Sequence, residues 1–320
     1  MPQTDSRVHL KDYKTKELQW DKFATARSIP RRMLPEGPLT GQMCPTARQP
    51  LYHHPLMQAV GQQAQDHLLI HTTYKYMSDI SHVEMDTVNQ ISLKIVNNTL
   101  PFSFSEDIQH DALAIIVDES YHAYVARDFM RQVIERSGVK PVTMPVKTVL
   151  SEAIAHGKSV LPENLHEVFE LVGVCVGENT LTKELLHLTG DRSMNPVVHQ
   201  VIEDHVRDES RHAVFFTHIL KLMWSALDEP SRSAIGPLLP EFILNYFKPD
   251  PQYERDVLRS LQVPEHHIDR ILGETFAPMP LEELWPRIPI IGHVMGVLKQ
   301  SGVLENGKTA DAFRRIKLLN

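Results

Sequence analysis

The amino-acid sequence predicts an all-α protein with a helical bundle at its centre. In residues 56–228, apolar side chains recur with the helical period of about 3.6 residues, and glycine and proline are sparse. Strand-like alternation is scarce, apart from a doubtful stretch at residues 139–149. The 320 residues are enough for one large domain with a sizeable core.

The chain divides into a proline-rich, irregular N-terminal arm at residues 1–55 and a single domain at residues 56–320. We expect the arm to lie over the body of the protein. Within the domain, a bundle at residues 56–228 precedes a tail at residues 229–320, where prolines alternate with short amphipathic stretches. In the bundle we expect helices near residues 57–78, 81–98, 107–136, 147–157, 163–189 and 196–227.

Several helix boundaries rest on residues that commonly start or stop helices. Ser105 is followed by two acidic residues and Asn195 by a proline, and both patterns are typical of helix N-termini. Gly138 and Gly190 follow the ends of apolar periods, where glycine commonly terminates a helix.

The composition excludes several classes of protein. A formal net charge of −7 argues against a nucleic-acid partner or an anionic membrane surface. No apolar run approaches the roughly 20 residues of a membrane-spanning helix, and the N-terminus lacks the apolar segment of a secretory signal. Two cysteines favour a reducing compartment, so we expect a cytoplasmic protein. The 18 histidines of this acidic chain suggest a joint use of imidazole and carboxylate.

Four central helices carry charged residues where an apolar stripe is expected. A buried, unpaired carboxylate would cost the core several kcal/mol, so these side chains need partners. A pair of metal ions would satisfy carboxylates and imidazoles together. The residues are Glu84, Glu119, His122, Glu178, His205, Glu209 and His212.

The spacing of these residues predicts a di-metal site. Two Glu-x-x-His units each place two ligands one turn apart on one helix face, and a single glutamate precedes each unit on an earlier helix. This is the ferritin-like di-iron arrangement. His205, one turn before Glu209, is a seventh candidate ligand.

Two further Glu-x-x-His units compete with the chosen ones. Glu163 and His166 lie at the polar start of their helix, whereas Glu184 and His187 lie towards its end. Choosing either unit would leave Glu178 buried without a partner. Both are therefore expected to be solvated helix residues.

An aspartate precedes each chosen unit, which suggests how the histidines are oriented. A metal-bound histidine usually donates its other ring N–H to a carboxylate. Across the bundle, we expect Asp118 to hold His212 and Asp208 to hold His122, with Arg211 neutralising one aspartate. The alternative is that both aspartates are solvated charges on helix faces.

The order of these ligands resembles the p-aminobenzoate N-oxygenase family of di-iron proteins. The resemblance covers roughly residues 56–224. The extra histidine, His205, separates this family from ferritins, ribonucleotide reductase small subunits and bacterial multicomponent monooxygenases. The resemblance implies a homodimer that binds two iron ions, uses O2 and an external electron donor, and oxidises an amine nitrogen to hydroxylamine, nitroso or nitro. Such a reaction would serve natural-product biosynthesis.

The donor set is compatible with iron. Two ferrous ions carry four positive charges, which match the four glutamates and leave a near-neutral site for a low-dielectric core. Hard oxygen ligands with imidazole suit iron, or manganese as a substitute, and the absence of thiolate ligands argues against structural zinc.

The expected substrate pocket departs from the family pattern. Members that oxidise aminobenzoate are expected to have an arginine before the first glutamate and an asparagine after the third, where this chain has Asp79 and Glu184. These acids would repel a carboxylate, unless both face solvent. The substrates considered are an arylamine, an amino acid and an aminoacyl group on a carrier protein, and those without a free carboxylate are favoured. Tyr76 is a further candidate for this pocket.

Other residues admit two interpretations. Cys175 lies one turn before Glu178 but is expected to be a small buried hydrophobic residue. The aromatic residues Tyr121, Tyr124 and Phe215 could line a substrate channel or simply belong to the core. Two basic clusters could dock an acidic carrier protein or be solvated charges: Arg27, Arg31 and Arg32 in the arm, and Arg314, Arg315 and Lys317 in the tail.

Two alternative functions remain open at this point. The first is a di-iron C–H hydroxylase or desaturase, and the second is a non-catalytic, iron-binding ferritin-like protein. The long tail argues against the second, because iron storage needs only a minimal bundle.

Overall fold

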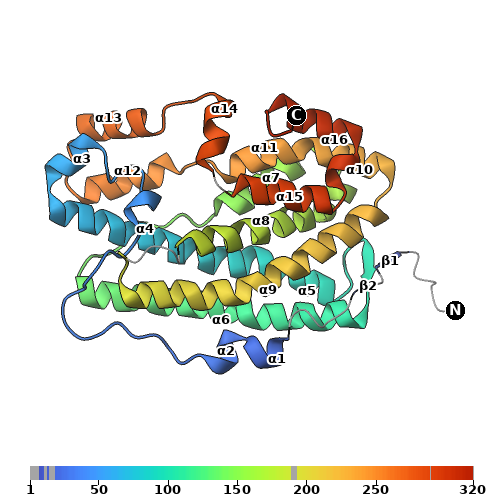
Figure 1. The fold of residues 1–320 in the computed structure, drawn as a ribbon, viewed down its shortest axis with the longest axis horizontal. Coiled ribbons are helices and arrows are strands. Elements are labelled where there is room, and N and C mark those ends of the chain that lie inside the picture. The colour runs from blue at the N-terminus through green and yellow to red at the C-terminus, as the bar shows by residue number, and fades with distance from the viewer. Residues whose placement is uncertain (1–6, 11–12, 14–18, 189–192, 289, 320) are drawn as a thin grey trace.

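Long helices form the centre of the protein, as expected (Figure 1). The computed structural model describes residues 7–10, 13, 19–188, 193–288 and 290–319, except for the side chains of residues 181–188. Helix α8 packs on α9, and α6 packs on α4, α5 and α9. Their bounds are α4 Gln62–Val83, α5 Asn89–Val96, α6 Glu106–Ser137, α8 His166–Leu188 and α9 Pro196–Ala226.

The ends of these helices follow the predicted signals. Ser105 caps α6 by accepting a hydrogen bond from the backbone N–H of Ile108, and Gly138 ends the same helix at φ 71°. Asn195 caps α9 by accepting a hydrogen bond from the N–H of Val197 at 2.9 Å. Gly190 lies outside the described residues.

The predicted break between helices 57–78 and 81–98 is wrong. The backbone stays helical from Gln62 to Val96, because a π-helical segment, η3 Glu84–Val88, joins α4 directly to α5. The actual interruption comes earlier, at Gly61, which separates α3 Pro55–Val60 from α4 with φ 110°. Glu84 therefore lies within a continuous helix, at a π-helical turn of the kind often found at functional sites.

The doubtful strand at residues 139–149 is also wrong. These residues form an irregular connection from α6 to α7 Val149–Ser159. The two strands of the described residues lie elsewhere: β1 Val8–Leu10 pairs in parallel with β2 Phe102–Phe104. Each has only three residues, which is too short to show a recognisable alternation.

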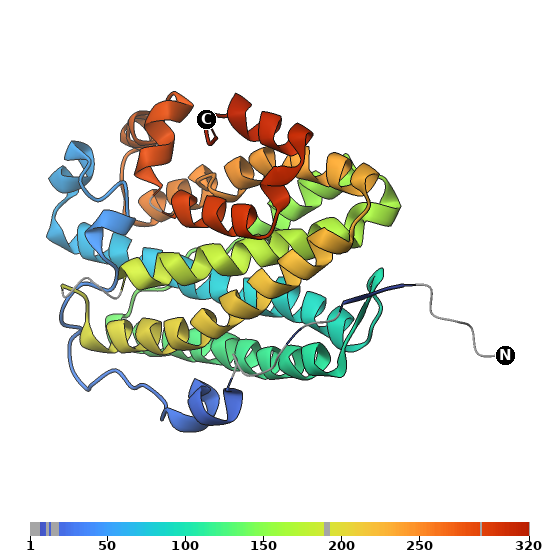
Figure 2. The same ribbon diagram turned by 45° about the vertical axis from the view of Figure 1, so that its right-hand side comes forward.

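The predicted C-terminal helices cover one side of the bundle. In Figures 1 and 2 they lie above α8, on the side opposite to α1 and α2. Helix α15 packs on α8, α11 on α7, and α12 on α4. Their bounds are α10 Glu229–Ile235, α11 Leu239–Tyr246, α12 Pro251–Ser260, α13 Glu265–Thr275, α14 Leu281–Leu284, α15 Ile291–Gln300 and α16 Gly307–Arg315.

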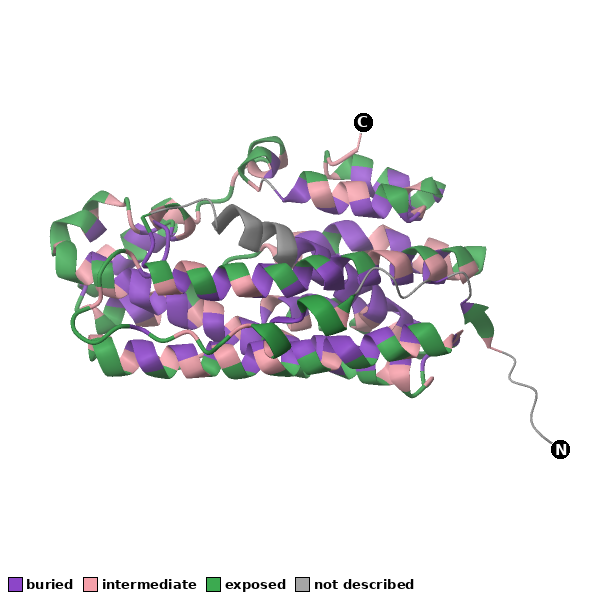
Figure 3. Cartoon of the chain, turned by 60° about the horizontal axis from the view of Figure 1, so that its bottom comes forward, coloured by how far each residue is buried: buried purple, intermediate pink, exposed green. Residues whose placement is uncertain are grey.

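The N-terminal arm lies against the opposite side. Its two short helices, α1 Trp20–Phe23 and α2 Thr25–Ser28, lie below α6 and α9 in Figure 1, and α2 contacts both. Figure 3 shows the alternation of buried and exposed residues along the bundle helices, with the buried faces turned inward. Among the described helices, none combines the length and apolar character needed to cross a membrane.

Candidate metal centre

The predicted metal ligands converge inside the bundle. Six of the seven form two overlapping groups, and within each group the candidate donor atoms all lie within 4.8 Å of one another. The groups share His122 and Glu209. The first group is Glu84, His122, His205 and Glu209, and the second is Glu119, His122, Glu209 and His212.

One carboxylate oxygen of Glu209 lies at the centre of the three imidazole rings. Its Oε1 atom is 3.1 Å from Nε2 of His205 and 3.3 Å from Nδ1 of both His122 and His212. These four residues come from α6 and α9, which brings the two Glu-x-x-His units face to face.

The other glutamates approach the same imidazoles from neighbouring positions. Glu119 places Oε2 2.9 Å from Nδ1 of His122 and Oε1 2.9 Å from Nδ1 of His212. Glu84, on the π-helical segment, places Oε1 3.3 Å from Nε2 of His205. The π-helical turn thus directs the Glu84 carboxylate into the site.

Glu178 faces the same charges from α8, although it lies outside the two groups. Its side chain is 1% exposed. Burial raises its pKa well above the usual range, and the negative charges of Glu209 and Glu119 raise it further. Burial and like charges, of which that of Glu119 has the largest effect, raise the pKa of Glu84 in the same way. The site therefore gathers more negative charge than the surrounding protein neutralises.

The aspartates before each unit contact the histidines across the bundle. Oδ2 of Asp208 is 3.1 Å from Nε2 of His122, and Oδ2 of Asp118 is 3.3 Å from Nε2 of His212. Arg211 donates to Asp118 at 3.2 Å and also to Asp208. The outward nitrogen of each ring thus meets an aspartate, while Nδ1 faces the glutamates.

The protonation pattern indicates which charge the site requires. Burial opposes charge on His122 and His212, yet the carboxylates around each ring raise both pKa values well above the usual range. Burial alone would raise the pKa of Glu119, but the facing histidines hold it at about 2. The buried carboxylates therefore require positive charge, which either protons or metal ions can supply.

The donor set fits a pair of divalent metal ions. All seven predicted ligands are at most 7% exposed. Both carboxylate oxygens of Glu84 are buried, and the groups that they face are the imidazole of His205 and the like-charged carboxylate of Glu119. Metal ions would replace the protons and satisfy such oxygens, because metal ligands bind in their deprotonated form.

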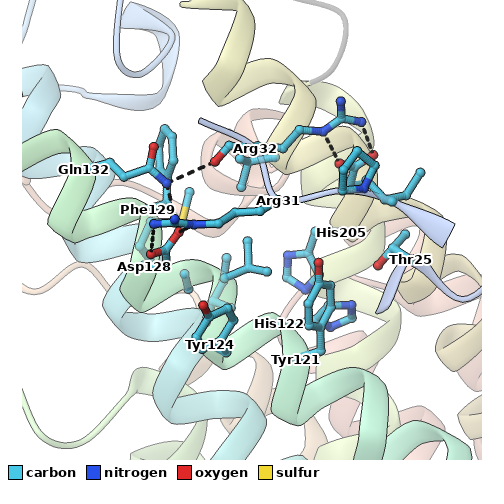
Figure 4. A pocket seen from close by; sticks show the side chains of 18 residues that line it. Thr25, Arg31, Arg32, Tyr121, His122, Tyr124, Asp128, Phe129, Gln132 and His205 are labelled. Carbon is cyan, nitrogen blue, oxygen red and sulfur yellow. Dashed lines mark hydrogen bonds and ion pairs between the residues drawn. The ribbon is translucent and has the colours of Figure 1, made fainter. Parts of the chain in front are cut away.

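A cavity of about 120 Å³ opens beside His122 and His205 (Figure 4). Its walls come from the N-terminal arm and from α4, α6 and α9. Most of the lining is apolar, including Met77, Ile80 and Phe129. Two of the aromatic residues considered for a substrate channel, Tyr121 and Tyr124, line this cavity.

Two charged residues at the cavity come from the arm, and both are paired. Arg31 makes a two-pronged contact with Asp128 at 2.6 and 2.8 Å. Arg32 does the same with Asp204 at 2.7 and 3.1 Å. Arg27 pairs with Asp21. These internal pairs account for the arm cluster without an acidic carrier protein.

Tyr76 and Asp79, the predicted pocket residues, line a different cavity. That cavity, of about 280 Å³, lies between α4, α7 and α11. Asp79 pairs with Lys75 at 2.6 Å, so a cation balances the carboxylate, whose pKa burial raises. Glu184 lies in α8, but its side chain, like that of His187, is outside the described part of the chain.

None of the remaining candidates belongs to the two groups of donor residues described above. Glu163 is exposed in a short 3-10 turn, and His166 contacts the backbone oxygen of Leu161. Cys175 is fully buried, and burial raises its pKa well above the usual range, as for an inert hydrophobic residue. Phe215 is a core residue at 1% exposure.

Sequence reasoning missed two residues of the arm that touch the site. Nε1 of Trp20 donates to Oδ1 of Asp118 at 2.8 Å. The backbone N–H of Thr25 donates to Oδ1 of Asp208 at 3.2 Å, and its hydroxyl donates to the same carboxylate. No spacing rule links residues so far apart in an irregular segment.

Comparison with known families agrees with this geometry. The family model for p-aminobenzoate N-oxygenase AurF matches residues 35–277, about three quarters of the chain. No curated protein matches the sequence closely enough for comparison. The chain therefore belongs to the p-aminobenzoate N-oxygenase AurF family, and it is an N-oxygenase with a ferritin-like fold and a buried carboxylate and histidine site.

Proposed function

We propose that this protein is a di-iron, O2-dependent N-oxygenase that acts on a small amine without a free carboxylate. The observation that carries the proposal is the apolar cavity that ends at His122 and His205, beside the buried carboxylates. Such a cavity would bring an amine nitrogen next to the metal ions while its walls exclude water.

The seven predicted residues would hold the two irons. Glu84 and His205 belong only to one group, Glu119 and His212 only to the other, and Glu209 lies in both. Bound iron would supply the redox chemistry that activates O2. Manganese, which accepts the same hard ligands, would be a substitute metal.

Glu178 would supply the fourth carboxylate, and two aspartates would orient the imidazoles. With a proton on Nε2, His122 donates to Asp208 and leaves Nδ1 free of a proton for a metal ion. Asp118 fixes the same tautomer in His212. The protein would thus set ring orientation before any metal arrives.

The cavity supports a substrate about the size of one aromatic ring. Its volume of about 120 Å³ is slightly below the ~150 Å³ of a protein cavity known to hold benzene. Among its described lining residues, both arginines already face aspartates. An arylamine, or the amine end of an aminoacyl group on a carrier protein, therefore fits better than free p-aminobenzoate.

Mass spectrometry after incubation with 18O2 tests the proposal. Reduced, iron-loaded protein would be given anilines with and without a carboxylate, amino acids, and carrier-bound aminoacyl groups. We expect 18O on the nitrogen of at least one substrate without a carboxylate, and none with Glu209→Ala. Products with oxygen only on carbon would instead indicate a C–H hydroxylase, and tight competitive binding of p-aminobenzoate would refute the substrate class.

The proposal includes a metal stoichiometry and an assembly. We expect two irons per chain, whereas a higher iron content would favour a storage protein. We also propose a homodimer that takes electrons from an external donor. Iron titration and light scattering of the purified protein would test the stoichiometry and the dimer.

A further inference from the structure

The N-terminal arm contacts both carboxylates that face the outer nitrogens of the site histidines. Trp20, on α1, donates its indole N–H to Asp118 at 2.8 Å. Thr25, on α2, donates its backbone N–H to Asp208 at 3.2 Å, and its hydroxyl donates as well. Thr25 and its neighbour Ala24 are at most 2% exposed, so this contact is part of the protein interior.

Each contact continues inward to an imidazole. Asp118 meets Nε2 of His212, and Asp208 meets Nε2 of His122. Two chains of hydrogen-bonding contacts therefore run from the arm to the metal centre. One links Trp20 through Asp118 to His212. The other links Thr25 through Asp208 to His122. A shift of either aspartate would turn the ring that it holds, because a ligand histidine depends on its outer hydrogen bond for orientation.

Charge balance gives the arm a further role. Asp118 and Asp208 are at most 1% exposed, and the guanidinium of Arg211 faces both. When the imidazoles bind metal as neutral ligands, one guanidinium cannot neutralise two buried carboxylates, so additional donors are needed. The arm supplies them through Trp20 and Thr25, and the carbonyl oxygen of Phe23 accepts a long hydrogen bond from Arg211 at 3.5 Å.

The arm is fastened to the bundle just beyond these contacts. Besides the ion pairs of Arg31 and Arg32, the backbone N–H of Leu34 donates to the side chain of Gln132 at 2.8 Å. The amide of Gln132 donates back to the carbonyl oxygen of Arg32 at 3.0 Å. Figure 4 shows the contacts of Arg31, Arg32 and Gln132 along the edge of the cavity. The arm is therefore held to the bundle both at Trp20 and Thr25 and at residues 31–34.

We propose that Trp20 and Thr25 are positioning residues of the metal centre, acting on His212 and His122 through Asp118 and Asp208. Both precede residue 35, where the match to the family model begins. The inference rests on the proposed di-iron site, and it adds to that site a segment outside the family match.

Metal release from the full-length protein tests this role without any substrate. Thr25→Val and Trp20→Phe would be loaded with ferrous iron without oxygen and mixed with excess chelator. Loss of a carboxylate that holds a ligand histidine typically lowers metal affinity 10–100-fold. Trp20 and Thr25 lie one hydrogen bond beyond these carboxylates, so their loss should lower the affinity by about tenfold, the lower limit of that range. We expect release about tenfold faster than in the unmodified protein, and Thr25→Ser, which keeps the hydroxyl, should restore the slow rate.

Matched controls remove hydrogen bonds of the same type elsewhere. Trp285→Phe removes an indole bond to the carbonyl oxygen of Ile316, and Thr73→Val removes a buried hydroxyl bond to that of Met43. Both should release iron at the unmodified rate. The visible spectrum of the cobalt-loaded protein gives a second measurement, and it should change in the two arm variants but not in the controls.

The outcomes separate this inference from the proposed function. If the unmodified protein binds two irons, but both arm variants keep its release rate and cobalt spectrum, the inference is overturned. Equal acceleration in the control variants would also overturn it, because the effect would then be general destabilisation. If the unmodified protein binds no iron, the proposed function itself fails.

Discussion

At the scale of single residues, the carboxylate of Glu209 contacts three histidines, one more than the two histidines of the Glu-x-x-His units. Its Oε1 lies within 3.3 Å of a nitrogen of each of His122, His205 and His212. Of the three rings, His205 alone belongs only to the group that contains Glu84. In the proposed assignment, His205 would serve one metal position and leave the donors of the other intact.

Removal of His205 should therefore affect one metal ion. In His205→Ala, the group of Glu119, His122, Glu209 and His212 keeps all its donors, so we expect iron content to fall from two ions per chain to about one. Atomic absorption after desalting measures this. His199→Ala, on the same helix but partly exposed, is the control and should keep two. Full iron content in His205→Ala would contradict the role of a seventh ligand.

His71 should make stability depend on pH. Its ring is 2% exposed, and burial lowers its pKa from 6.5 to about 4. The unfolded chain therefore takes up the proton first, so the stability present above pH 6.5 is lost as the pH falls towards 4. Between pH 7 and pH 4, the free energy of unfolding of His71→Gln should therefore fall by about 2 kcal/mol less than that of the unmodified protein, after allowance for solvent screening. Urea unfolding at each pH measures it, and equal losses would contradict it.

At the scale of elements, the π-helical segment allows one continuous helix to carry both the buried carboxylate of Glu84 and an apolar face that packs in the core. Glu84 begins this segment, Val88 ends it, and Ile91 and Ile95 follow in α5; all four are fully buried. The extra residue of a π turn changes the direction of the side chains without breaking the helix. The carboxylate can therefore face α9 while the next residues pack in the core.

Gly61 permits the sharp entry into this long helix. Its backbone, at φ 110° and ψ 166°, is essentially restricted to glycine. A Cβ atom added there would meet nothing within 4 Å, so any cost of Gly61→Ala comes from the backbone. We expect a loss of about 1–3 kcal/mol in unfolding free energy.

A helical glycine provides the matched control. A Cβ added at Gly273, exposed near the end of α13, also meets nothing within 4 Å. Gly273→Ala should therefore stabilise the protein, by up to about 1 kcal/mol. Urea unfolding would show whether each substitution lowers or raises the free energy of unfolding. Equal changes in the two variants would contradict this account of Gly61.

At the scale of the whole molecule, the buried negative charge should make the stability of the fold depend on bound metal. Four glutamates share one interior site, and burial with like charge raises the pKa of two of them. Metal ions that bind only the folded chain stabilise it by about 2.7 kcal/mol per site at a free concentration 100-fold above Kd. The metal-loaded and metal-free proteins should therefore differ widely in stability.

Ferrous iron should raise the melting temperature by roughly 10 °C if two sites fill, given about 2 °C per kcal/mol for a chain of this size. Calorimetry without oxygen measures the shift, with and without a chelator. His212→Ala, which removes a donor of the second group only, should show about half of it. The absence of a shift in the unmodified protein would contradict a metal pair.

The sequence predicts the bundle better than it predicts what surrounds the bundle. Glu119 and His122 lie on a regular helical stripe, so the period alone places them on one face. The π-helical turn at Glu84 was not predictable, because a single extra residue leaves no pattern. Trp20 and Thr25 were missed because they act through contacts between segments 98 and 183 residues apart.

Those separations also determine the order in which the protein can assemble. The ribosome makes the arm first, yet Thr25 has no partner until Asp208 has been synthesised, 183 residues later. Closing so long a loop costs chain entropy, so docking of the arm should follow the pairing of α6 with α9. Until then the arm would not cover Asp118 and Asp208, so the proposed metal centre should be open on that side in the newly made chain.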